Sequence, residues 1–378
     1  MNTAYCTSSP SLETTLVPPA GFPACREAVT PDWVRETLAD HPRFSLDPIR
    51  TVELTDLGDG LGQLSALTLA GLTCASGRRG QLVIKLHAPV PDMHQVALNY
   101  GHYENEVRFY AEMAQRVPMR TPEIYVSAMD PVHNRVVIVM EGFGAWHSPD
   151  QIAGATAREV SIAVGALAGL AATFWDAPPR ETFPWLRAAD SPAYASLPQD
   201  YAACLPGALE RFESIWPEGS ARTLARIARG YGGLREAVLT RTQVLSHWDY
   251  RVENLFFGTG GELAVIDWQL MCLDSPAHDL AYLLATNVET ALRREIEAEM
   301  MALYLRRLRQ HGVTGYGEAE LIEDYRRALL SVSVITVIGG ANADIENARS
   351  QALFARMGSR LLAAIDDWQA TEVLDGRC

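Results

Sequence analysis

The residues between His247 and Asn254, in the sequence HWDYRVEN, carry the clearest chemical signal in the chain. Asp249 precedes Asn254 by five residues, and Asp267 ends an apolar stretch 13 residues after Asn254. Phosphoryl transfer needs positioning and charge neutralisation more than covalent chemistry, and these residue types can supply both. Asp249 can accept the proton of an attacking hydroxyl, whereas Asn254 and Asp267 offer oxygen ligands of the kind that Mg²⁺ prefers. The pattern therefore predicts magnesium-assisted phosphoryl transfer.

The segments HWDYRVEN and VIDWQ resemble the catalytic and metal-binding loops of the aminoglycoside phosphotransferase and choline-kinase-like superfamily. These proteins are small-molecule relatives of the protein kinases, and the nearest branch is that of the ecdysteroid-kinase-like phosphotransferases. The resemblance covers roughly residues 50–290. The family pattern usually has glycine between the histidine and the aspartate, where this chain has Trp248. The departure leaves Asp249 in place but brings a large side chain next to it.

The resemblance implies an α+β, protein-kinase-like fold of two lobes, with an antiparallel sheet in the N-terminal lobe and a larger, helical C-terminal lobe. We expect a loosely ordered lead-in at residues 1–29, a nucleotide-binding lobe at 30–140, a hinge at 141–144 and the helical lobe at 145–378. The turn signals independently predict a three-strand antiparallel meander in the first lobe. A cleft between two lobes is a common place for a ligand.

The individual elements are predicted from alternation, turn residues and helical periodicity. Strands are expected at 50–57, 63–70, 81–86, 123–128 and 135–140, and a helix of the same lobe at 101–116. Helices of the second lobe are expected at 155–175, 199–216, 219–240, 277–309, 317–338 and 344–369. Thr30 and Pro31 have the residue types of a helix N-cap and first position, and they predict a short helix through Leu38.

Lys85 and Glu106 match two nucleotide-binding positions that the resemblance implies. A strand lysine is expected to meet the α- and β-phosphates of ATP, and a helix glutamate, here 21 residues downstream, is expected to pair with it. Lys85 is the only lysine of the chain, because 31 of the 32 basic residues are arginine. A compact ammonium and a planar guanidinium are not interchangeable. The single lysine is therefore a specific candidate for nucleotide binding.

The resemblance implies two further parts of the nucleotide site. A glycine-containing turn over the phosphates corresponds to Gly58, Gly60 and Gly62, although a glycine cluster is most often an ordinary turn. A hinge whose backbone meets adenine corresponds to the segment that contains Glu141 and Phe143. Together with Lys85 and Glu106, these residues form the predicted ATP site.

Polar residues close to the motif are interpreted mainly as structural supports. His247 can hydrogen-bond backbone carbonyls and hold the catalytic loop. Asp279 could cap the helix that follows it, or accept hydrogen bonds from backbone amides of the catalytic loop. Arg251 could neutralise phosphate charge, although an arginine on a loop is more often solvated.

Composition and the chain ends argue against several other functions. The formal net charge of −14 disfavours binding to nucleic acid or to a membrane surface through bulk charge. The six cysteines form no CxxC pair or zinc-like spacing, and no GxSxG elbow of a serine hydrolase occurs. The N-terminus does not resemble a secretory signal. The longest apolar stretch, near 329–340, is too short to span a bilayer. We therefore expect a cytoplasmic protein, either monomer or homodimer.

These expectations describe an ATP- and Mg²⁺-dependent kinase that phosphorylates a hydroxyl group of a small organic molecule. Aromatic residues at 174–216 could line a pocket for a hydroxylated natural product, a steroid-like compound or an antibiotic, although core packing is expected to account for most of them. A choline or amino-alcohol kinase, with aromatics around an ammonium group, and an aminoglycoside kinase stay open. A catalytically inactive, nucleotide-binding regulator is the non-enzymatic alternative, and the intact motif argues against it.

Overall fold

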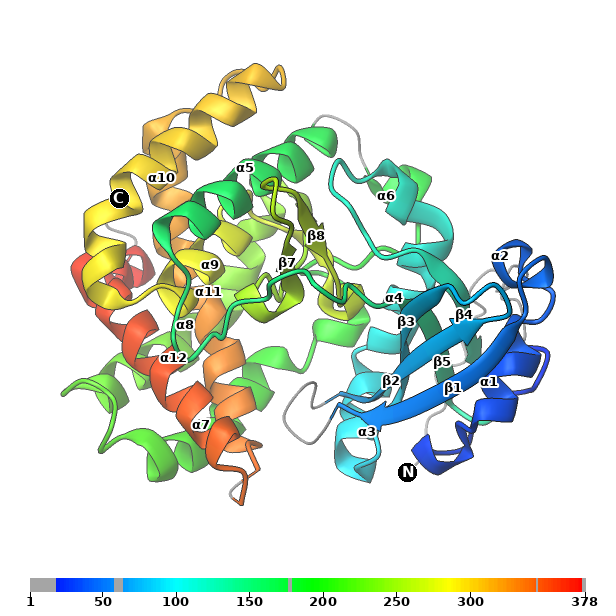
Figure 1. Cartoon of the computed structure of the whole chain (residues 1–378). Coiled ribbons are helices and arrows are strands. Elements are labelled where there is room, and N and C mark those ends of the chain that lie inside the picture. The colour runs from blue at the N-terminus through cyan, green and yellow to red at the C-terminus, as the bar shows by residue number, and fades with distance from the viewer. Residues whose placement is uncertain (1–17, 58–63, 176–178, 345, 376–378) are drawn as a thin grey trace.

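The N-terminal lobe is built on a five-stranded antiparallel sheet in the order β1–β2–β3–β5–β4 (Figure 1). The computed structural model describes residues 18–57, 64–175, 179–344 and 346–375. The strands of the sheet are β1 (Ile49–Asp56), β2 (Ser65–Cys74), β3 (Arg79–His87), β4 (Ile124–Asp130) and β5 (Arg135–Glu141). This sheet and the larger helical lobe beside it confirm the predicted α+β fold. The residue limits of the lobes and of the hinge stay predictions.

The first three strands form the predicted meander. Lys85 on β3 lies opposite Leu67 on β2 and opposite Ile138 on β5, so it occupies a central position in the sheet. Strand β2 extends beyond its expected end at residue 70, because Leu72 and Cys74 continue its inward-facing alternation. A central strand restrains its side chains on both sides, which suits a residue that must hold a fixed position.

The two faces of the sheet have different neighbours. Side chains alternate along a strand, so Ile84 and Lys85 point to opposite faces. Ile84 belongs to an apolar core on the outer face, where α1 (Pro31–Leu38) and α2 (Pro42–Ser45) lie on the side away from the helical lobe (Figure 1). Lys85 faces the other way, toward α4. Helix α1 has the predicted N-cap, because Thr30 Oγ1 accepts a 3.1 Å hydrogen bond from the third residue of the helix.

The helix expected at 101–116 is not uniform. It consists of α4 (His102–Arg108), a π-helical turn η2 (Phe109–Met113) and a 3₁₀ turn η3 (Ala114–Arg116), and an unpredicted helix α3 (Pro91–Asn99) precedes it. The wider turn lets the ring of Phe109 lie on that of Trp268, with centroids 4.1 Å apart. A contact of this kind between distant residues does not show in the local periodicity of the sequence.

The C-terminal lobe combines helices with four short strands. The helices are α5 (Ala157–Thr173), α6 (Pro179–Thr182), α7 (Leu197–Phe212), α8 (Ser220–Leu239), α9 (His278–Asn287), α10 (Thr290–Gln310), α11 (Glu318–Ala341) and α12 (Ala348–Asp367). The strands are β6 (Val244–Ser246), β7 (Leu255–Phe257), β8 (Leu263–Val265) and β9 (Cys272–Asp274), which pair as β6–β9 and β7–β8. These two small ribbons carry the HWDYRVEN and VIDWQ segments between them.

The single helix expected at 277–309 is wrong, because α9 and α10 are separate helices. The break follows Asn287, whose side-chain amide donates to the carbonyl of Tyr282 at 3.1 Å and to Thr286 Oγ1 at 2.8 Å. The backbone carbonyl of Asn287 then accepts a hydrogen bond from Ala155 at 2.8 Å. Side-chain bonds to the backbone compete with helix continuation, and here they end the helix.

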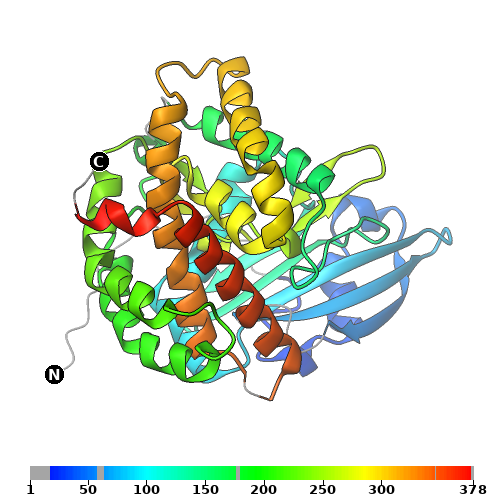
Figure 2. The same cartoon turned by 90° about the vertical axis from the view of Figure 1, so that its left-hand side faces the viewer.

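Helix α11 lies at the centre of the helical lobe. It packs against α7, α8, α9 and α12, and Figure 2 shows it beside α12. Its middle turns are buried almost entirely, which agrees with the apolar stretch near its C-terminal half. Among the residues that the structure describes, no helix is long and apolar enough to cross a membrane.

Candidate active site

Lys85 forms two buried ion pairs. Its Nζ atom lies 2.7 Å from Glu106 Oε2 and 2.8 Å from Asp267 Oδ1. Burial alone would lower the pKa of Lys85, but the neighbouring charges of Asp267 and Glu106 hold it above its usual range. The lysine is therefore protonated at neutral pH. Three segments that are distant in the sequence, β3, α4 and the turn after β8, meet at this ammonium group.

Asp267 occupies an unusual backbone conformation. Its φ of 65° and ψ of 63° lie in the left-handed region, which a residue other than glycine rarely adopts. Burial alone would raise the pKa of this carboxyl, but the charge and hydrogen bond of Lys85 keep it below its usual range. A strained conformation persists only where the surroundings fix it. Here the ion pair with Lys85 and the buried ring of Trp268 supply that restraint.

The catalytic loop, between β6 and β7, is held by hydrogen bonds at its start. The carboxylate of Asp279 accepts the backbone N–H groups of His247 at 2.7 Å and of Trp248 at 2.9 Å. His247 Nε2 donates to the carbonyl of Ile266 at 3.0 Å, next to Asp267. These are the kinds of contact expected for both side chains from the sequence. Their assignment as supports stays a prediction until variants are measured.

Trp248 stands where the family pattern usually has glycine, and its surroundings show how the larger residue is accommodated. Its φ is 67°, so the position needs the left-handed conformation that glycine adopts most readily. The indole Nε1 donates to Asp274 Oδ2 at 2.7 Å, and the ring stacks on His278 with centroids 5.0 Å apart. Arg235 Cζ lies 5.4 Å from the same ring. The side chain therefore packs into a buried cluster, whose contacts offset a strain of about 1–3 kcal/mol.

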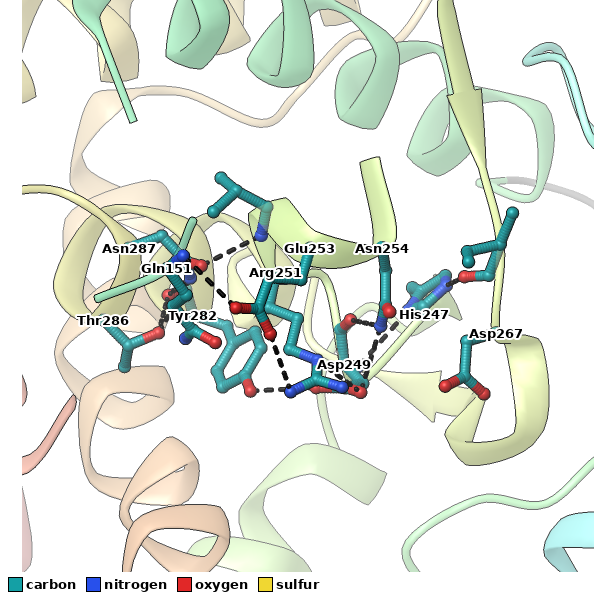
Figure 3. Close-up of polar contacts among 12 residues, drawn as sticks. Gln151, His247, Asp249, Arg251, Glu253, Asn254, Asp267, Tyr282, Thr286 and Asn287 are labelled. Carbon is teal, nitrogen blue, oxygen red and sulfur yellow. Dashed lines mark hydrogen bonds and ion pairs between the residues drawn. The ribbon is translucent and has the colours of Figure 1, made fainter. Parts of the chain in front are cut away.

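Asp249 is surrounded by hydrogen-bond donors (Figure 3). Tyr282 OH donates to its Oδ1 at 2.9 Å, and Asn254 Nδ2 donates to its Oδ2 at 3.1 Å. Asn254 Nδ2 also donates to the backbone carbonyl of Asp249 at 2.9 Å. Burial raises the pKa of Asp249 above its usual range, although the Arg251 charge opposes the effect. The carboxylate is thus fixed in one orientation.

Arg251, expected to be solvated, is largely buried. Its guanidinium lies 3.4 Å from Asp249 Oδ2 and 3.4 Å from Glu253 Oε2. Glu253 in turn forms a 2.5 Å ion pair with Arg349 on α12. Arg251 is thus more enclosed than its loop position suggested, and the contact of Tyr282 with Asp249 was not predicted. The position of Tyr282, three residues after Asp279 on one helix, is a signal that could have identified it, because such residues share a helix face.

The predicted hinge contains several internal bonds. The backbone N–H of Glu141 donates to the backbone carbonyl of Glu123 at 2.8 Å. The carboxylate of Glu141 pairs with Arg120 at 2.6 Å. The guanidinium of Arg120 lies 4.8 Å from the ring of Phe143, which also faces the ring of Phe256 on β7 at 5.0 Å. The Glu141 N–H is therefore already used within the protein. Phe256 was not identified from the sequence.

Gly58, Gly60 and Gly62 lie outside the described residues. Their expected contact with phosphates therefore stays a prediction. The flanking strands β1 and β2 are paired antiparallel up to Asp56 and Thr68, so the intervening segment connects two adjacent strands of the sheet.

The side-chain oxygens of Asn254 and Asp267 are suited to Mg²⁺ that is bound together with a nucleotide, rather than to a metal ion held by protein ligands alone. Within the described part of the chain, no three His, Cys, Asp or Glu side chains are grouped as a metal site would require. Asp267 Oδ1 contacts Lys85, and the amide nitrogen of Asn254 contacts Asp249, which leaves one oxygen on each side chain for a cation. Mg²⁺ commonly takes one or two protein ligands and completes its shell with phosphates and water.

Comparison with known proteins identifies the family. Residues 76–328, more than half of the chain, match the model of the phosphotransferase enzyme family. No curated protein matches the chain in sequence. The chain belongs to the phosphotransferase enzyme family, and it is a small-molecule kinase with an alcohol group as acceptor, as the motifs predicted.

Solved structures share the fold. An ethanolamine kinase from Plasmodium vivax is 12% identical over 84% of this chain and 83% of its own, with a TM-score of 0.52. The GDP complex of an aminoglycoside 2'-phosphotransferase-IIIa is 16% identical over 90% and 96%, with a TM-score of 0.50. A macrolide 2'-phosphotransferase from Brachybacterium faecium is 17% identical over 86% and 97%, with a TM-score of 0.48. For the ethanolamine kinase and the aminoglycoside phosphotransferase, the likeness at these identities extends to the fold alone.

Proposed function

We propose that this protein transfers the γ-phosphoryl group of ATP to a hydroxyl group of a small organic molecule, with Mg²⁺ bound to the nucleotide. The observation that carries the proposal is the meeting of two units. One is the Lys85–Glu106–Asp267 ion cluster, and the other is the Asp249–Asn254 pair. They are linked because the N–H of Ile266, next to Asp267, donates to the carbonyl of Asn254 at 3.1 Å. The order and spacing of these residues in the sequence support the same assignment.

In this proposal the chain contributes position and charge. Lys85, held by Glu106, binds the α- and β-phosphates. Asn254 and Asp267 hold Mg²⁺, which, when bound, neutralises charge on the transferring group. Asp249 orients the acceptor hydroxyl and takes its proton, because Tyr282 and the loop itself fix the carboxylate. These steps need no covalent enzyme intermediate.

Arg251 is a further candidate for phosphate contact. It lies beside Asp249, with its Nε 3.4 Å from Asp249 Oδ2, and its side chain is largely enclosed. A buried guanidinium beside the proposed acceptor base can stabilise negative charge on the transferring phosphoryl group. Adenine is expected between the lobes, at the backbone of Glu141 and Phe143, with Phe256 below it.

The acceptor is proposed as a class rather than a compound. Of the aromatic residues expected to line its pocket, most are core residues with an exposed fraction of 5% or less, namely Phe174, Phe183, Tyr194, Tyr201, Phe212 and Trp216. Trp175 and Trp185 are only partly buried. The segment 174–216 therefore gives little support to a large apolar pocket or to an aromatic cage for ammonium. A hydroxylated natural product or antibiotic, an amino alcohol and an aminoglycoside are the acceptor classes to test.

A metabolite screen tests the proposal. The wild-type chain is incubated with ATP, Mg²⁺ and a library that includes choline, ethanolamine, aminoglycosides, macrolides and hydroxysteroids. Mass spectrometry then searches for products that carry one added phosphate. A product and stoichiometric ADP support the proposal. Nucleotide binding without any phosphorylated product across the panel would favour the inactive regulator instead.

A further inference from the structure

Asn105, the neighbour of Glu106 on α4, is buried completely and has a fully bonded side chain. Its amide nitrogen donates to the backbone carbonyls of Gln269 and Met271, both at 3.1 Å. Its carbonyl oxygen accepts a hydrogen bond from Arg187 Nη1. The two carbonyls belong to the turn that directly follows Asp267. One side chain of the N-terminal lobe thus connects the helix of Glu106 to the segment of Asp267.

Arg187 contacts the N-terminal end of α4. Its Nη1 also donates to the carbonyl of Gly101 at 3.1 Å, and its Nη2 lies 3.3 Å from Glu104 Oε2. The backbone carbonyl of Arg187 accepts the N–H of Leu273, on β9, at 2.7 Å. Arg187 is therefore anchored to the strand after Asp267 while its side chain reaches α4.

Gly101 lies directly against the guanidinium of Arg187. Its φ of 65° favours glycine, and a Cβ at the position would collide with the guanidinium of Arg187. The stacking of Phe109 on Trp268 joins the same two segments. Several independent contacts therefore fix α4 relative to the turn after Asp267.

We propose that Asn105 and Arg187 are positioning residues, which hold Glu106 and hence Lys85 in place against Asp267. The inference rests on the proposed roles of Lys85 and Glu106 in nucleotide binding. Lys85 can reach both carboxylates only if β3, α4 and the turn after β8 keep their relative positions. Asn105 provides that restraint because it bonds the turn directly, one residue away from Glu106. The ion cluster is thereby assembled without a further conformational step.

A double-mutant cycle tests the proposal. The dissociation constant of Mg-ADP is measured by calorimetry for the wild type, Asn105→Ala, Glu106→Gln and the double variant. We expect Asn105→Ala alone to raise the dissociation constant about tenfold, and to add less than about twofold in the Glu106→Gln background. If Asn105 only stabilised the fold, Asn105→Ala would lower the melting temperature. Its effect on the dissociation constant of Mg-ADP would then be the same in the wild-type and Glu106→Gln backgrounds.

The single lysine gives a second measurement. An acyl-phosphate derivative of ATP acylates a lysine near the phosphates, and peptide mass spectrometry assigns the label to Lys85, the only lysine, and separates it from any label on the α-amino group. We expect slower labelling in Asn105→Ala and in Arg187→Lys. The latter keeps the charge but loses the fork whose Nη1 bonds Gly101 and Asn105 and whose Nη2 pairs with Glu104. Arg187→Lys also serves if Asn105→Ala does not fold.

The control is Arg180→Ala, which removes an exposed ion pair with Asp190 close to Arg187 in the sequence. It should leave binding and labelling unchanged. Wild-type binding and labelling in Asn105→Ala and Arg187→Lys, with Glu106→Gln impaired, would overturn this inference alone. A wild-type chain that bound no nucleotide would contradict the proposed function, and this inference with it.

Discussion

Lys85 is distinguished from the other basic residues both by its type and by its enclosed position. Composition singles it out, because all other basic residues are arginine. The structure adds the reason, since the side chain is 5% exposed and its ammonium lies within 2.8 Å of two carboxylates. A guanidinium is longer and planar, so it cannot occupy the same enclosed position with both contacts intact.

We predict that Lys85→Arg lowers phosphotransfer on the order of 100-fold, because the cation no longer meets the phosphates correctly. Arg79→Lys is the matched control, because Arg79 is exposed on the same strand and should tolerate the reverse exchange. Initial rates of ADP formation with the acceptor found in the screen measure both. Comparable rates for Lys85→Arg and the wild type would contradict a phosphate-binding role for Lys85.

The packing of Trp248 could not be predicted from the sequence. The departure from glycine can be recognised in the sequence, but the direction of the indole cannot. It depends on Asp274, His278 and Arg235, which lie on three other segments. The same holds for Tyr282 and Arg251, whose contacts with Asp249 exist only after the loop and α9 have packed together.

At the scale of elements, α9 supports the catalytic loop. Asp279, at its first turn, accepts two loop amides, and Tyr282, one turn later, reaches Asp249. Burial alone would raise the pKa of Asp279, but its hydrogen bond with His278, the neighbouring histidine charges and the loop amide keep it below its usual range. The ionised form is thus the one that holds the loop.

We predict that Asp279→Asn lowers the unfolding free energy by about 2–3 kcal/mol at pH 7. The NH₂ group of the asparagine would face one of the backbone N–H groups that the carboxylate now accepts, so that two donors would oppose each other. A carboxylate whose folded pKa is depressed stabilises the fold above its unfolded pKa, about 3.9, and the stabilisation is lost as the pH falls through the folded pKa. The difference between wild type and variant should therefore narrow below about pH 4. Urea denaturation at several pH values measures it.

Asp190→Asn is the control for this experiment, because Asp190 pairs with Arg180 at the surface. Exposed pairs contribute little, so its effect should stay under about 1 kcal/mol. An Asp279→Asn difference that did not change between pH 7 and pH 3 would show that the charge of Asp279 is not what holds the loop.

The regular elements were largely predictable, whereas their interruptions were not. Alternation and turn residues located all strands of the large sheet, although β2 alternates in burial whereas β5 is buried on both faces. The π-helical turn at 109–113 was missed, and its Phe109 ring stacks on a residue far along the chain. The helix break after Asn287 was missed too, although the side chain of Asn287 bonds locally to Tyr282 and Thr286. In the candidate site, the family resemblance identified the ion-pair residues, whereas Asn105, which bonds the turn after Asp267, was not identified.

At the scale of the whole molecule, α12 connects the segment before α5 to the linker between α9 and α10. Arg360 is 2% exposed and donates to the carbonyls of Gln151 at 2.7 Å and of Ile152 at 3.0 Å. Its Nη2 also lies 3.2 Å from Glu289, in the linker between α9 and α10. One guanidinium thus connects three separate parts of the C-terminal lobe.

We predict that Arg360→Ala lowers the unfolding free energy by about 3 kcal/mol, because it leaves buried carbonyls without a donor. Arg356→Ala is the matched control, since Arg356 is exposed on the same helix and lies 3.9 Å from the same glutamate. Thermal and chemical unfolding of the two variants measure the effect. Equal stability of both variants would show that the buried bonds of Arg360 contribute no more than a surface ion pair.

The proposed phosphotransfer depends most on Asp249, the group that receives the proton of the acceptor. The most direct test compares wild type and Asp249→Ala with the acceptor from the metabolite screen, and measures phosphorylated product and Mg-ADP binding in parallel. We predict that the variant forms no detectable product while its dissociation constant for Mg-ADP stays within about threefold of the wild type. Product formation by Asp249→Ala at the wild-type rate would contradict the assignment.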